Sequence, residues 1–105
     1  MIHEDRAESA VEFLRDTAEQ YGQMRGRVAY AEGNLRRVKA LEMLNKEGGL
    51  GMREAEALGS DAYLAALEDE QNAVAEFETL RAKREAAVLT IEVWRSQNST
   101  RRQGL

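Results

Sequence analysis

Residues 14–38 decide the fold, and they read LRDTAEQYGQMRGRVAYAEGNLRRV. Apolar residues recur here every seven positions, and a second apolar row follows three residues after members of the first. Such a heptad pattern places both rows on one face of an α-helix, where they form a seam for a partner helix. We therefore predict a long helix from about Asp5 to Lys46. Its seam residues are Leu14, Tyr21, Val28 and Leu35, with Met24, Ala31 and Val38.

Glycines mark the end of this first helix, in the stretch Gly48-Gly49-Leu50-Gly51. Glycine commonly follows a helix end because it adopts backbone conformations that other residues avoid. We predict a glycine loop at residues 48–51. Residues 53–58 then read as a short helix, which Gly59 ends.

A second long helix is predicted from Asp61 to about Gln97. Ser60 is a typical N-cap for it, and the acidic Asp61 is favourable in a first turn. The polar residues 98–105 are expected to fray beyond its end. The predicted fold class is all-α: an antiparallel helical hairpin of two long helices with a short helix between them, forming a single helical domain over residues 1–105.

Charge supports the hairpin independently of the apolar pattern. Residues 1–20 have a net charge of −4 and residues 21–46 one of +4, whereas residues 47–78 carry −8 and residues 79–105 carry +4. In an antiparallel hairpin the acidic start faces the basic end, and the two middle blocks face each other. Folding at the loop would bring Leu14 near Trp94. An antiparallel pair of first helices from two copies would satisfy part of the same complementarity.

The composition narrows the class of protein. Proline is absent, and aromatic residues make up only 6% of the chain, so a thin seam between helices fits better than a thick core. Absence of cysteine excludes disulfides and thiolate metal sites. The acidic N-terminus does not resemble a secretory signal, and no apolar run reaches the roughly 20 residues of a membrane helix. We expect a cytoplasmic protein without membrane contact.

Self-association is expected because a two-helix core of this size contributes only about 3–5 kcal/mol. Three glycines inside the first helix should each cost about 1 kcal/mol relative to alanine. Together with one alanine they form a single stripe, on which another helix could approach closely. The other interpretation is that the glycines let a long helix bend. The predicted interface of a coiled-coil-like homo-oligomer consists of Gly22, Gly26, Ala29 and Gly33.

The residue types needed for catalysis are missing. His3 is the only histidine, so no catalytic triad can be assembled and a zinc site is not expected. The neighbouring acids Glu68, Asp69 and Glu70 point in different directions on a helix. The glycine loop lacks the Lys-Ser/Thr pair of a phosphate-binding loop. We predict no enzyme activity, no cofactor and no metal.

Basic residues toward the C-terminus are the candidates for nucleic-acid binding. Cationic side chains displace counterions from phosphates, and a tryptophan can stack on the bases of a single strand. The competing explanation is that the basic blocks are neutralised within the hairpin, with Arg81 and Arg84 pairing with groups of the first helix. The acidic pI of about 5.1 favours that explanation. The predicted DNA-binding residues are Arg95, Arg101, Arg102 and Trp94.

Three stretches, taken together, carry a resemblance to known proteins. They are residues 35–41 (LRRVKAL), 53–61 (REAEALGSD) and 91–98 (IEVWRSQN). Their order and spacing resemble small helical proteins of bacteriophage replication and recombination gene clusters, and the layout looks like that of UvsY-type recombination mediators. The resemblance covers about residues 20–102. It implies an oligomer in the cytoplasm of the bacterial host that binds single-stranded DNA and loads a recombinase onto strands covered by a single-strand-binding protein.

Two hypotheses about function follow. The first is a non-enzymatic phage recombination or replication accessory protein that binds single-stranded DNA and a recombinase. The second is a homo-oligomeric helical scaffold or adaptor that binds only protein partners, and it is motivated by the charge pairing within the hairpin.

Overall fold

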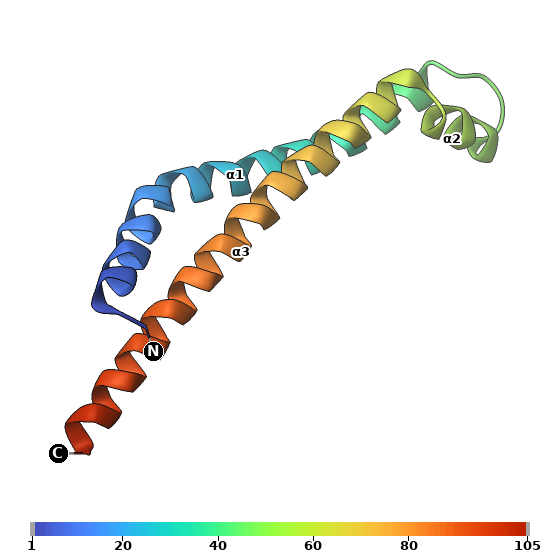
Figure 1. Ribbon diagram of the computed structural model, residues 1–105. Helices are drawn as coiled ribbons and strands as arrows, with labels where there is room; N and C mark the ends of the chain where they lie inside the picture. The colour runs from blue at the N-terminus through green and yellow to red at the C-terminus, as the bar shows by residue number, and fades with distance from the viewer. Residues whose placement is uncertain (1, 105) are drawn as a thin grey trace. The chain divides into compact units, whose positions relative to one another are not determined.

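The computed structural model describes residues 2–104, and within that range it contains helices but no strand (Figure 1). Helix α1 spans Glu4–Leu44, α2 spans Leu50–Leu58 and α3 spans Asp61–Gln103. The prediction of two long helices with a short one between them is confirmed. Helix contacts divide the chain into two compact units. We call them the terminal unit (described residues 2–22 and 78–104) and the loop unit (Gln23–Phe77).

Burial confirms the heptad seam of α1. Every predicted seam residue is at least partly buried, and Ala31 is only 9% exposed. The same spacing extends toward the N-terminus through Ala10 and Ala7, which are both buried. Alanine is common at these positions because a small side chain lets two helices approach closely.

In the terminal unit, the start of α1 runs antiparallel to the end of α3. The backbone N–H of Ile2 donates a hydrogen bond of 3.0 Å to Gln97 Oε1, and Arg84 Nη1 donates one of 2.8 Å to the carbonyl of Leu14. Low residue numbers in α1 therefore meet high numbers in α3. The buried residues of this unit are Ala7, Ala10 and Leu80.

The predicted register in the terminal unit is wrong. Leu14 lies beside Arg84, and Trp94 lines a groove with Ala7 and Val11 instead of meeting Leu14. The ten residues from Arg84 to Trp94 correspond to a rise of about 15 Å along a helix. Ten residues are one heptad plus three, which is the spacing between the two rows of the seam, so both registers set seam positions opposite seam positions. The apolar pattern alone is therefore compatible with both registers.

In the loop unit, α1 also pairs with the chain that follows the loop. Arg27 Nη1 lies 2.8 Å from Glu76 Oε2 on α3, and Lys39 Nζ lies 2.8 Å from Glu54 Oε1 on α2. These ion pairs confirm that the basic half of the first helix faces the acidic stretch after the loop. The buried residues of this unit are Ala31, Ala57, Ala66 and Ala73.

The connection between α1 and α2 differs from the predicted loop at residues 48–51. Gly48 has a φ of +105°, which L-residues rarely adopt, and Gly49 is the N-cap, whose carbonyl accepts a hydrogen bond from the N–H of Arg53. These two glycines complete the turn. Helix α2 therefore begins at Leu50 rather than Arg53, and Gly51 lies within its first turn.

One end of α3 agrees with the prediction and the other does not. Ser60 is the N-cap, since its Oγ accepts a hydrogen bond of 3.2 Å from the N–H of Tyr63. At the C-terminal end, residues 98–103 continue the helix instead of leaving it near Gln97. No proline or glycine interrupts this segment before Gly104, and the two arginines of the last turn interact favourably with the helix dipole.

Candidate functional site

The residues predicted to bind DNA line two adjoining grooves of the terminal unit. Trp94, Arg101 and Arg102 line a groove of about 530 Å³ together with His3. Arg95 lines a second groove of about 420 Å³, and Trp94 also belongs to that groove. Each of the four predicted residues therefore lines one of two grooves that share Trp94.

The two grooves differ in charge. The Arg95 groove has an acidic rim along α1, where carboxylates would repel phosphates. The other groove has Arg101, Arg102 and a single acid among its described lining residues. It is the better of the two for a phosphate backbone. The acids of the first rim are Glu4, Glu8 and Glu12, and Glu4 also lines the second groove.

Arg84 joins the two helices of the terminal unit. Its Nη1 donates hydrogen bonds to the Leu14 carbonyl and, at 2.6 Å, to Thr17 Oγ1, and its guanidinium lies 4.8 Å from the centre of the Tyr21 ring. A guanidinium suits a seam position because its flat face stacks on an aromatic ring while its N–H groups reach oxygen atoms. The predicted pairing of Arg84 with first-helix groups is confirmed.

Arg81 behaves differently from Arg84, because its ion pairs lie within α3. Its Nε is 3.2 Å from Glu85 Oε1, and its Nη1 is 3.5 Å from Glu78 Oε1. The charge of Glu78, followed by the hydrogen bond to Glu85, raises the pKa of Arg81 above its ordinary value. All three side chains are about half exposed, so these pairs add little to stability.

The glycine stripe of α1 is open. A methyl group placed on Gly22, Gly26 or Gly33 would meet no neighbouring side chain or helix within 4 Å. Ala29, on the same stripe, is exposed. The stripe as an oligomer interface remains a prediction.

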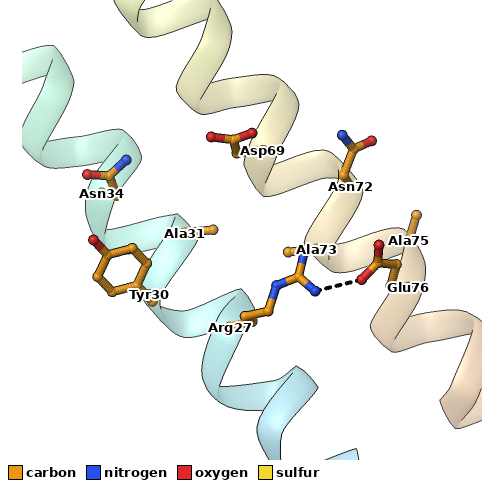
Figure 2. A pocket seen from close by; sticks show the side chains of 9 residues that line it. All are labelled: Arg27, Tyr30, Ala31, Asn34, Asp69, Asn72, Ala73, Ala75 and Glu76. Carbon is orange, nitrogen blue, oxygen red and sulfur yellow. Dashed lines mark hydrogen bonds and ion pairs between the residues drawn. The ribbon is translucent and has the colours of Figure 1, made fainter.

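A third groove, between α1 and α3 of the loop unit, was not predicted from the sequence (Figure 2). Its volume is about 560 Å³, and it contains the buried Ala31 and Ala73, which are 9% and 4% exposed. Arg27 on α1 reaches Glu76 on α3 across it, as Figure 2 shows. Tyr30 lies beside it with 73% of its surface exposed. The remaining lining residues are Asn34, Asp69, Asn72 and Ala75.

Helix α2 is anchored by one alanine and one ion pair. Ala57 is fully buried, and Glu54 pairs with Lys39 of α1. The hydrogen bond between them raises the pKa of Lys39 and lowers that of Glu54. Arg53 Nε is buried without a hydrogen-bond partner among the described residues.

Residues 2–104 contain neither a metal site nor a membrane-spanning helix. No group of three or more His, Cys, Asp or Glu side chains in this range is placed to hold a metal ion. No helix in the same range combines the length and the apolar character needed to cross a membrane. Comparisons of the chain with protein families, curated proteins and solved structures find no match.

Proposed function

We propose that the protein is a non-catalytic helical interaction protein that works as a homo-oligomer. The pattern of burial supports this function. The buried residues are six alanines and Leu80, and no large side chain among the described residues is fully buried. Large apolar side chains lie instead at the surface of both units, each 40–76% exposed. They are Val11, Tyr30, Leu41, Leu44, Leu50, Met52, Leu58, Leu64, Val88, Leu89 and Val93.

Single exposed apolar residues are normal on any protein surface. This protein combines many such residues with a core made almost entirely of alanine, which buries little apolar area per residue. A second copy that covers part of this surface would supply the missing burial.

Thermal unfolding at several protein concentrations tests this proposal. The melting temperature of an oligomer rises with concentration when dissociation is coupled to unfolding. We expect Tm, followed by circular dichroism, to rise over a hundredfold range of concentration. A Tm that stays constant over that range would contradict self-association.

A second candidate function, binding of single-stranded DNA, is supported by the groove of Arg101 and Arg102. Trp94 lines the same groove and offers a ring on which a base can stack. An oligomer would present several such grooves, so weak contacts could add along one strand. With the resemblance noted above, this supports a phage recombination or replication accessory protein with a recombinase and a single-strand-binding protein as partners.

The DNA candidate is tested by fluorescence anisotropy with a labelled oligothymidylate. We expect binding at low salt that weakens as salt is added, and weaker binding by Arg102→Glu than by the parent. Lys83→Glu is a control with the same charge change, because Lys83 is exposed in the terminal unit and does not line this groove. No binding by the intact protein at low salt would eliminate this candidate and leave the protein scaffold.

A further inference from the structure

The groove of Figure 2 lies on a face of the loop unit that is bordered by a row of residues on α1. The row has alternating spacings of three and four residues, which keep it on one side of a helix. It is rich in bulky and basic side chains, so we call it the bulky row. It consists of Arg27, Tyr30, Asn34, Arg37, Leu41 and Leu44.

A second row, on α3, borders the same face and has the opposite character. Its members follow the same spacing, are all exposed, and are small, amide or acidic residues, so we call it the small row. Both rows contribute to the lining of the groove, which shows that they flank one surface. The small row consists of Ala62, Ala65, Asp69, Asn72 and Glu76.

The apolar members of the bulky row are left uncovered. Tyr30 is 73% exposed, Leu41 47% and Leu44 76%. Between the two rows, the buried Ala31 and Ala73 leave a hollow of about 560 Å³. The face therefore carries both projecting side chains and a recess for side chains of this size.

Charge is also complementary across the face. Arg27 of the bulky row pairs with Glu76 of the small row within the chain. Arg37 and Asp69 are both exposed, and neither forms an ion pair among the described residues. A partner that covers this face would complement its charges by placing an acidic side chain opposite Arg37 and a basic side chain opposite Asp69.

We propose that this face is a two-fold interface with a second copy of the same chain. This inference rests on the proposed self-association and specifies its surface. A two-fold axis parallel to the helices and midway between the two rows places α1 of each copy antiparallel against α3 of the other, as in a four-helix bundle. The bulky row of each copy then covers the small row of its partner, with Tyr30 in the alanine-lined groove.

A second copy of the chain is the partner that fits, because each chain carries both the bulky row and the small row that complements it. Each copy offers one bulky, basic row and one small, acidic row, so the contact forms twice and closes on itself. Interhelical packing of large residues onto alanines also matches the close approach that helices make in such bundles.

Two double variants test the interface through the molar mass measured by light scattering. Arg37→Glu with Leu41→Glu makes both rows acidic, and Ala65→Lys with Asp69→Lys makes both rows basic. We expect each variant alone to have the mass of one chain, 11.8 kDa, under conditions in which the parent has twice that mass. An equimolar mixture of the two variants should recover the dimer. In a mixed dimer, one of the two contacts joins the unchanged bulky row to the unchanged small row. The other contact sets the introduced glutamates against the introduced lysines.

All four positions are exposed and helical, so the variants should keep the helix content of the parent in circular dichroism. Ala82→Lys, at an exposed alanine of α3 in the terminal unit, is the matched control and should keep the parent mass. If a double variant loses helicity, Ala65→Arg alone obstructs the same face by bulk and should still give single chains.

Each remaining outcome separates the two proposals. A parent with the mass of a single chain at every concentration would end both of them. An oligomeric parent whose two double variants keep its mass would overturn this interface and leave self-association standing. Monomeric variants whose mixture stays monomeric would overturn the pairing of bulky row on small row.

Discussion

Arg84 is a charged residue in a row of seam positions, seven residues from Phe77 and seven from Ile91. Its position is explained by three partners on α1: the Leu14 carbonyl, Thr17 Oγ1 and the Tyr21 ring. These contacts let a cation occupy a place where the heptad pattern favours an apolar residue. Arg84 therefore links the N-terminal half of α1 to the C-terminal half of α3.

Arg84→Glu should therefore destabilise the protein. The carboxylate would face carbonyl and hydroxyl oxygens that need a donor, and the stacking on Tyr21 would be lost. We expect unfolding to become easier by about 1–3 kcal/mol, the range for a lost partner of a partly buried polar group. Thermal denaturation measures the change, and Arg84→Leu, which extends the apolar seam, should be much closer to the parent. Equal effects of the two substitutions would contradict this role.

The sequence is a good guide at the residue scale where the cause is local. The seam residues of α1 follow from their spacing, and the cap at Ser60 follows from its hydroxyl and the acid after it. The alanine-lined groove was missed because it depends on which alanines of α1 and α3 face each other. That depends on register, which a seven-residue repeat leaves open.

At the element scale, α2 depends on Ala57, which is fully buried. Ala57→Leu would force extra volume into this contact, and we expect a loss of stability of about 1–3 kcal/mol. Ala55→Leu is the matched control, since Ala55 lies on the same helix and is exposed. Chemical denaturation compares the two variants, and an equal effect would show that α2 is not anchored through Ala57.

The ion pair between Lys39 and Glu54 should make the anchoring of α2 depend on pH. The pKa of Glu54 is lowered from its ordinary 4.5, so the pair contributes fully above that pH and is lost as pH falls through the lowered value. The pKa of Lys39 is raised from 10.5, so the contribution is also lost at the alkaline end, as pH rises through the raised value.

Glu54→Gln should accordingly lower Tm slightly at pH 7 and make no difference near pH 2. Glu56→Gln is the control, because Glu56 is exposed on the same helix and forms no ion pair among the described residues. Melting curves of the three proteins at both pH values decide the question. A difference between Glu54→Gln and the parent that persists at low pH would exclude the ion pair as its cause.

The helices themselves were largely predictable, and their ends were not. The existence and order of the three helices follow from apolar periodicity and from the glycines between residues 48 and 59. The sequence predicts a start of α2 three residues too late, because Gly51 looks like part of the loop, whereas Gly48 and Gly49 alone complete the turn. The sequence predicts an end of α3 six residues too early, because its last residues are polar, whereas nothing in residues 98–103 interrupts a helix.

At the scale of the whole molecule, a single chain leaves much apolar surface uncovered. The alanine core, the exposed leucines and Tyr30 all support association, and both candidate functions use an oligomer. Charge patterns correctly indicated that the basic half of α1 pairs with the acidic stretch on α2 and α3 in the loop unit. They could not indicate the number of copies, because the same complementarity is satisfied within one chain or between two.

Sedimentation equilibrium of the purified chain tests self-association most directly. We expect a molar mass of twice 11.8 kDa at high concentration, falling toward that of one chain on dilution. A mass of 11.8 kDa at every concentration up to the millimolar range would contradict the account.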